Sequence, residues 1–366
     1  MTSRPISLAP FESNTGPGGD AIATIANIVE RLLGIQPASV RRMAGGGNNK
    51  LFKFEGTNGE CVVAKQYFRH SSDGTNRLDA EFGGLGFLWR HGMRRIAKPL
   101  ACDRDIGVAV YQYVGGAPAN SRLPGAADVA QAAAFLRRLR GLAELPKART
   151  LPAAAEACFS LEELLDNLTL RLSRLSGVAP KSRLFEELCA LRDDEIAPAL
   201  EKLAASARIR RQQSGQNPRA ALDPSRRTLS PSDFGFRNAI RQQDDTLIFV
   251  DFEYFGWDDP AKTISDFLLH PAMELTHAQG EEFFSQCLED FSDPDLASRT
   301  RAYFPLFGLK WVFITLNEFS PDGWQRRVFS GLDDQSAEAH LRGQLNKAKN
   351  FLNNAIRANE EFTYAA

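Results

Sequence analysis

The chain has 366 residues, of which 44 are basic and 45 are acidic. Because these charges nearly cancel, the sequence argues against a protein that binds nucleic acid or a membrane surface through its overall charge. The cysteines and histidines show none of the spacings that hold zinc, and no serine lies in a G-x-S-x-G elbow. We expect a reduced, soluble, cytoplasmic protein without a membrane span, and the length favours two lobes with a cleft between them.

The first part of the chain is expected to form a tail and a small sheet lobe. Residues 1–20 lack periodicity and are predicted to be a flexible tail, after which apolar residues at helical spacing indicate a helix over 22–33. Short β-prone runs then alternate with glycine-rich turns, which predicts a mainly antiparallel sheet with one inserted helix. The Thr57-Asn58-Gly59 turn predicts a hairpin within residues 50–68. Together, residues 21–114 are expected to form an N-terminal lobe.

A larger, mostly helical lobe is predicted to follow the Gly115-Gly116 boundary and to span residues 115–366. Its helical periodicity covers 125–142, 158–176 and 183–206, and a polar stretch follows at 207–226. Short strands and tight loops return at 227–255, and helices are expected beyond Pro260, including an aromatic run from Tyr303 to Phe319 that we interpret as core. This order favours the α+β class over a doubly wound sheet.

Three polar residues in the short-strand region carry a possible chemistry. Asp233 and Asn238 are five residues apart in a predicted loop, and Asp251 follows the β-prone run 246–250. Phosphoryl transfer requires Mg²⁺ to neutralise phosphate charge, and Mg²⁺ prefers carboxylate or amide oxygens, which suits Asn238 and Asp251. Asp233 then remains to accept the proton of an attacking hydroxyl. Alone, the D-x-x-x-x-N spacing is equally typical of a polar turn, but the second carboxylate pair, Asp251 and Glu253, makes the combination more specific.

The sheet lobe offers partners for such a site. A kinase-type site needs a strand lysine that holds the nucleotide phosphates and a helix glutamate that orients it. Val62-Val63-Ala64-Lys65 supplies the lysine, and Glu81 in the helical stretch 75–91 supplies the glutamate. Asp79 stays open as an alternative partner. A solvated strand lysine and a solvent-facing glutamate are the competing interpretations.

Two backbone segments could contact a nucleotide. The glycine turn that contains Gly45, Gly46, Gly47 and Asn48 lies ahead of Lys65, where its N–H groups could approach phosphates. It is not a G-x-G-x-x-G motif, and such turns commonly serve geometry alone. The strand end Gln112-Tyr113-Val114 precedes the lobe boundary and could hydrogen-bond an adenine, or could be an ordinary strand end.

These residues resemble the aminoglycoside phosphotransferase and choline/ethanolamine kinase superfamily over about residues 38–270. The family loop H-G-D-x-x-x-x-N is similar to the segment from Pro231 to Asn238, and its I-D-F-E-Y strand is similar to Val250-Asp251-Phe252-Glu253-Tyr254. A D-P-x-x-D-L-A-like helix follows in both. The resemblance implies a protein-kinase-like, two-lobed fold that uses ATP and Mg²⁺ and transfers phosphate to a small hydroxylated molecule, such as an aminoglycoside-, choline- or sugar-like acceptor.

The resemblance assigns Asp233 as the base, Asn238 and Asp251 as metal ligands, and Lys65 with Glu81 as the phosphate-positioning pair. Three carboxylates, Glu253, Asp258 and Asp259, are expected to line the acceptor side, where they would favour an ammonium-bearing acceptor. Alternatively, Asp258 and Asp259 cap the helix that begins at Pro260.

The clearest departure from the family lies in the catalytic loop, where Pro231 replaces the family histidine and Ser232 replaces the glycine. This departure motivates one rival hypothesis, a pseudokinase or scaffold that binds nucleotide with little turnover. A second rival is a helical interaction protein that does not bind Mg²⁺-ATP. The acceptor's identity and the oligomeric state correspond to no pattern in the sequence.

Overall fold

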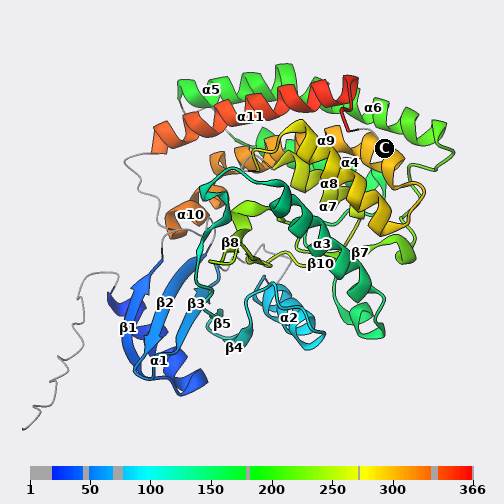
Figure 1. Cartoon of the computed structure of the whole chain (residues 1–366). Coiled ribbons are helices and arrows are strands. Elements are labelled where there is room, and N and C mark those ends of the chain that lie inside the picture. Colours follow the sequence, from blue (N-terminus) through cyan, green and yellow to red (C-terminus); the bar gives the residue numbers. More distant parts are fainter. Residues whose placement is uncertain are drawn as a thin grey trace, which may run out of the picture.

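The computed structural model describes residues 19–43, 49–68, 77–178, 182–270, 273–330 and 337–364. Its N-terminal part is a five-stranded antiparallel sheet with a helix on each side (Figure 1). The elements are α1 (Gly19–Leu33), β1 (Pro37–Arg42), β2 (Lys50–Gly56), β3 (Cys61–Gln66), α2 (Arg77–Arg90), β4 (Pro99–Asp103) and β5 (Val108–Gln112). The predicted tail and the glycine turn at 44–48 lie outside the described residues.

The sheet has the order β1-β2-β3-β5-β4, and every neighbouring pair is antiparallel. The predicted hairpin is confirmed: β2 pairs with β3 around a turn in which Gly59 has a φ of 81°, a conformation that glycine adopts without strain. Phe54 and Ala64 are buried with the apolar face of α1. Because side chains alternate along a strand, Lys65 lies on the opposite face, toward α2.

The rest of the chain is mostly helical, as predicted. Its helices are α3 (Ala126–Ala143), α4 (Leu161–Ser176), α5 (Arg183–Ala190), α6 (Ala197–Gln213), α7 (Pro260–Leu269), α8 (His277–Phe291), α9 (Leu296–Leu316), α10 (Pro321–Ser330) and α11 (Ala337–Glu360). The helix predicted over 183–206 instead contains a π-helical segment, Leu191–Ile196, between α5 and α6, and it continues to Gln213. The arginines and glutamines after residue 206 are good helix formers, which explains why the predicted polar stretch begins later.

Short strands connect the two parts. The chain leaves the large sheet after Gln112 and enters β6 (Ala117–Pro118), which pairs with β8 (Ala239–Arg241), and β8 pairs with β9 (Leu247–Phe249). Between β5 and β6, Gly116 has a φ of 139°, and a Cβ at this residue would lie 2.2 Å from the carbonyl oxygen of Arg241. The predicted boundary at Gly115-Gly116 therefore falls in this link. A second pair joins β7 (Thr228–Ser230) to β10 (Gly256–Asp258).

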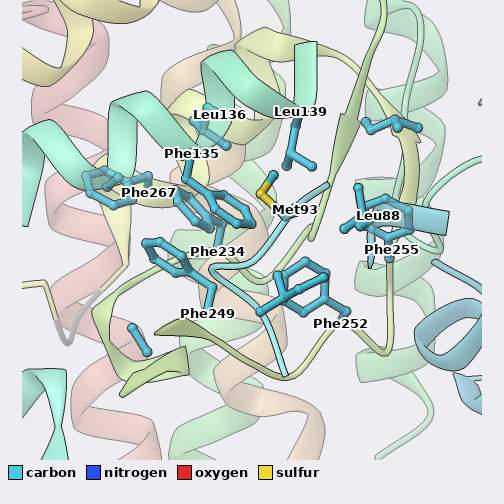
Figure 2. Packing of buried hydrophobic residues seen from close by; sticks show 14 of the residues in the cluster. Leu88, Met93, Phe135, Leu136, Leu139, Phe234, Phe249, Phe252, Phe255 and Phe267 are labelled. Carbon is cyan, nitrogen blue, oxygen red and sulfur yellow. The ribbon is translucent and has the colours of Figure 1, made fainter. Parts of the chain in front are cut away.

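One aromatic cluster positions the loops that follow β7 and β9. Phe135 of α3 stacks on Phe234 with ring centroids 5.6 Å apart and lies 4.5 Å from Phe249. Phe252 joins the same cluster, as Figure 2 shows. Phe234 and Phe252 each directly follow a candidate carboxylate, Asp233 and Asp251. Burial of Phe234 and Phe252 therefore anchors both loops in the core, and this anchoring fixes the positions of Asp233 and Asp251.

Helix α9 is the centre of the helical layer. Tyr303, Phe307 and Phe313 are buried in a second core cluster with α4, α6 and α11, which confirms the interpretation of the aromatic run as core. Within the described residues, no helix is both long and apolar enough to span a membrane.

Two adjacent glycines of α2 give a matched test of the packing. A Cβ at Gly84 would lie 2.3 Å from the ring of Phe255, whereas a Cβ at Gly83 would meet nothing within 4 Å. We expect Gly84→Ala to lower the free energy of unfolding by about 1–3 kcal/mol through overpacking. Gly83→Ala should raise it by about 0.5–1 kcal/mol, because alanine favours the helix. Urea unfolding measures both, and equal effects at the two positions would contradict the close contact.

Candidate active site

Lys65 joins the sheet, α2 and the strand-end loop that carries Asp251. Its Nζ donates to Oε2 of Glu81 at 2.6 Å and to Oδ1 of Asp251 at 2.5 Å. Glu81 also accepts hydrogen bonds from the hydroxyl of Tyr67 and from the backbone N–H of Phe252. The structure thus pairs Lys65 with Glu81, and the alternative, Asp79, instead pairs with Arg104 at the surface.

The electrostatics of this cluster favour an ionised lysine. Burial alone would lower the pKa of Lys65, but the carboxylates of Asp251 and Glu81 outweigh it and hold the pKa well above its ordinary value. Burial likewise opposes ionisation of Asp251, yet the Lys65 ammonium keeps its pKa below the usual range. Burial raises the pKa of Glu81, and the contact with Lys65 opposes that rise. The short contacts favour the fully ionised arrangement, in which a buried charge always has a partner.

Asp233 and Asp251 are the carboxylates of this group that reach solvent. Their side chains are 26% and 33% exposed, whereas that of Glu81 is 4% exposed. Asn238 connects their loops: its Nδ2 donates to both the backbone oxygen and Oδ2 of Asp233, and its carbonyl accepts from the N–H of Val250. The predicted trio is therefore brought together at one open edge.

Two residues of these loops adopt a left-handed backbone, which is rare outside glycine. Ser232 has a φ of 69° and Asp251 a φ of 67°. Such conformations cost about 1–3 kcal/mol each and persist only where the surroundings enforce them. Both residues sit at the turns that present the exposed carboxylates, so the strain coincides with the candidate site.

Burial controls the protonation of Asp233. It raises the pKa of this carboxyl to about 6, while the nearby Arg237 guanidinium acts in the opposite direction. A carboxylate with a pKa near the working pH is suited to accept a proton during reaction.

His270 lies beside Asp233, and no sequence pattern singled it out. Its Nε2 is 3.8 Å from Oδ1 of Asp233, and burial lowers its pKa to about 3, so the ring is neutral at physiological pH. The ring packs edge-on against Trp311 of α9. The indole N–H of Trp311 is buried and has no hydrogen-bond partner among the described residues. His270 therefore links Asp233 to Trp311 of α9 in the interior of the protein.

Asp251 and Asn238 fit a magnesium ion bound together with nucleotide phosphates. Oδ1 of Asp251 contacts Lys65 while the side chain stays partly exposed, and Asn238 uses its amide nitrogen within the loop, which leaves its amide oxygen as a ligand. In the described part of the chain, no group of three His, Cys, Asp or Glu side chains is arranged to hold a metal ion by itself. Mg²⁺ at nucleotide sites takes one or two protein oxygens and completes its shell with phosphates and water, so the donor set is sufficient.

The structure corrects the assignment of Glu253, Asp258 and Asp259 to the acceptor side. All three are buried and engaged by the protein itself. Glu253 accepts a hydrogen bond from Asn49 at 2.5 Å across the two lobes, and Asp258 lies 3.0 Å from Nζ of Lys262. Asp259 caps α7 by accepting from the N–H of Ala261 and pairs with Arg299. Asp259 is therefore a helix cap, as the alternative interpretation had it. Its position next to the motif at Val250–Tyr254 wrongly suggested a role in binding the acceptor.

In the strand end Gln112-Tyr113-Val114, which was predicted to contact adenine, two backbone N–H groups are already hydrogen-bonded within the protein. The N–H of Gln112 donates to the carbonyl of Lys98, and that of Tyr113 donates to the carbonyl of Cys61. Among the described residues, Val114 therefore carries the N–H of this segment that is left for a nucleotide. The predicted phosphate turn at Gly45, Gly46, Gly47 and Asn48 lies outside the described residues.

A family model described as the phosphotransferase enzyme family matches residues 39–302. The chain belongs to this family. A comparison with curated proteins returned no match. The motif order read from the sequence thus identified the correct family, although the catalytic loop lacks the family histidine.

Solved phosphotransferases and kinases share the fold across nearly the whole chain. A spectinomycin phosphotransferase, in complex with ADP and spectinomycin, is 9% identical with a TM-score of 0.62 and matches over 91% of this chain and 98% of its own. The choline kinase of Streptococcus pneumoniae is 16% identical with a TM-score of 0.56, over 92% and 99%. An aminoglycoside phosphotransferase with ADP and hygromycin B is 13% identical with a TM-score of 0.54, over 92% and 98%. The predicted kinase-like α+β fold is therefore confirmed.

The buried Lys65 pair makes a prediction about stability. Lys65→Met leaves Glu81 buried without its cation, so we expect a loss of about 3–5 kcal/mol in the free energy of unfolding at pH 7. The loss should shrink toward pH 5, because the raised pKa of Glu81 allows it to become neutral as the pH falls. Lys53→Met, which removes the partner of exposed Glu55 on β2, is the control and should cost little. Denaturant unfolding at both pH values measures this, and a deficit independent of pH would contradict it.

Proposed function

We propose that this phosphotransferase moves the γ-phosphate of ATP, with Mg²⁺, to a hydroxyl of a small molecule. The observation that carries the proposal is the convergence of Lys65, Asp251, Asn238 and Asp233 at one partly exposed edge between the lobes. Lys65, held by Glu81, is the cation for the nucleotide phosphates. The family membership and the ADP bound to similar kinases support a nucleotide substrate.

The protein groups divide the reaction between them. Asp233 accepts the proton of the acceptor hydroxyl as its oxygen forms a bond to the γ-phosphorus, and the bond to the β-phosphate oxygen breaks to release ADP. Asp251 and the amide oxygen of Asn238 would hold Mg²⁺, which would neutralise phosphate charge. Asn238 also orients Asp233 through its two hydrogen bonds. Each group is within its loop's hydrogen-bonding network before any substrate arrives, which lowers the cost of ordering the site.

The acceptor is expected beside the partly exposed carboxylate of Asp233. His270, next to Asp233, is buried and neutral, so it adds no charge to this side of the site. The carboxylates that favoured an ammonium-bearing acceptor are buried, so that argument loses its support. A hydroxylated acceptor fits the role of Asp233 as proton acceptor, and choline-like compounds belong in the same screen.

Two aspartate variants separate catalysis from nucleotide binding. We expect Asp233→Ala to lower turnover by about 10²–10⁴-fold, because it removes the proton acceptor, while the thermal stabilisation by Mg²⁺-ATP persists. Asp251→Ala should abolish that stabilisation in addition to turnover. ADP release is measured with spectinomycin, hygromycin B, choline and ethanolamine as acceptors. Mg²⁺-ATP binding without turnover in the wild type would favour the pseudokinase, and no thermal response would favour the interaction protein.

The raised pKa of Asp233 predicts an acidic limb in the pH profile. Because the base must be ionised, kcat/KM should fall about tenfold per pH unit below a pKa of about 6. Titration of Asp233 does not unfold the protein at acidic pH, so it does not produce this limb by loss of structure. Its folded pKa lies above that of an unfolded aspartate, so protonation stabilises the folded state as the pH falls. Initial rates between pH 4.5 and 8, with circular dichroism as the control for folding, measure the profile. A flat profile down to pH 5 would contradict the assignment.

A further inference from the structure

The catalytic loop begins with a strained three-residue turn. Strand β7 ends at Ser230, and the N–H of Asp233 donates to the carbonyl of Pro231 at 3.0 Å across Ser232. With a φ of 69° at its central residue, this turn matches the rare γ-turn, which is strained for any residue with a Cβ. The family sequence has glycine at this position, where the same φ carries little penalty. Ser232 therefore needs something to enforce its conformation.

Helix α7 supplies contacts that hold the turn. The ammonium of Lys262 donates to Oγ of Ser232 at 2.9 Å, and the hydroxyls of Thr263 and Ser230 are hydrogen-bonded at 2.9 Å. The N–H of Ser232 donates in turn to Oγ of Ser230 at 3.0 Å. The buried Ser230, Ser232 and Thr263 have no solvent to replace these bonds. The turn is thus tied to α7 at two successive residues of the helix.

The position of Lys262 is itself fixed by charge. Its side chain is 1% exposed, and its Nζ lies 3.0 Å from Oδ2 of Asp258 and 2.8 Å from Oδ2 of Asp266. An ammonium between two buried carboxylates has few alternative positions, because any displacement leaves a charge without its partner. The hydrogen bond to Ser232 is consequently rigid, in contrast to one from a solvated lysine.

The same face of α7 reaches the catalytic carboxylate. Lys262 and Asp266 are four residues apart, so they lie along one side of the helix, and His270 directly follows its last residue, Leu269. At one end of this side Lys262 holds Ser232, and at the other end Nε2 of His270 lies 3.8 Å from Oδ1 of Asp233. One end of α7 therefore contacts the turn at Ser232, and the residue after its other end lies beside the partly exposed carboxylate of Asp233.

We propose that Lys262 is a positioning residue for catalysis: through Ser232 it enforces the left-handed turn that directs Asp233 toward the acceptor. This inference rests on the proposed function. It accounts for how the loop is shaped where Pro231 and Ser232 replace the histidine and glycine of the family pattern. The contact comes from α7, outside the loop itself, and Lys262 acts through Ser232 without touching substrate.

Substitutions at Ser232 separate the contact from the turn. Ser232→Ala keeps the strained Cβ but loses the bond to Lys262, and we expect kcat to fall about tenfold or more with little change in the KM for ATP. Ser232→Gly also loses the bond but tolerates the turn, so its kcat should exceed that of Ser232→Ala about fivefold or more. The matched control is Ser265→Ala, another buried hydroxyl of α7, whose Oγ donates to the carbonyl of Ala261 within the helix. It should leave the ratio of kcat to KM near that of the wild type.

The experiment measures kcat and KM for ATP with the acceptor that the wild type phosphorylates best, together with the Tm of each variant. Lys262→Met should lower kcat, and the double variant with Ser232→Ala should lower it no further, because both remove one contact. Wild-type kcat in Ser232→Ala, or equal losses in the alanine and glycine variants, would overturn the proposal. A wild type without turnover would count against the proposed function instead. In that case the Tm values still test whether the turn is strained. A Tm of Ser232→Ala at or above that of Ser232→Gly would overturn the proposal, and a lower Tm of Ser232→Ala would support it.

Discussion

The contact of Lys65 with Glu81 and Asp251 is the constraint on which the site depends. It joins a strand of the sheet, the helix α2 and the loop after β9, which come from distant parts of the chain. A buried ammonium must keep both carboxylates near it, because separation would leave charges without partners in a medium that solvates them poorly. The two lobes are therefore held in register at the proposed nucleotide site. Glu253 adds a second link across the lobes through Asn49.

The larger lobe holds the loops that carry Asp233 and Asp251 rigidly. Aromatic packing of Phe135, Phe234 and Phe252 fixes the loops on their buried side (Figure 2), and α7 holds the turn ahead of Asp233. Rigid support is what phosphoryl transfer requires, since catalysis there consists largely of positioning and charge neutralisation. The strained φ angles of Ser232 and Asp251 are consistent with this, because loops under no such constraint would relax.

Much of the fold and part of the site could be predicted from local sequence. The Asn58-Gly59 turn specified its hairpin, and Lys65, Glu81 and Asp251 were recognisable because each occupies a typical position on a strand or helix. His270 and Lys262 were not recognisable, because their roles depend on how α7 and its C-terminal end pack against a loop far away in the sequence. Asp258 and Asp259 were misassigned because their position beside a catalytic motif suggested chemistry, whereas their charges serve an ion pair and a helix cap.

The most direct test of the account follows the phosphate itself. ATP labelled at the γ-phosphate is incubated with Mg²⁺, the wild-type protein and the hydroxylated acceptors, and the label is traced by chromatography. The account predicts that label appears on an acceptor with the wild type and is lost with Asp233→Ala, which keeps its Mg²⁺-ATP thermal shift. Label transfer that survives in Asp233→Ala would contradict the role of Asp233. Bound nucleotide whose label reaches no acceptor would contradict the phosphotransferase activity.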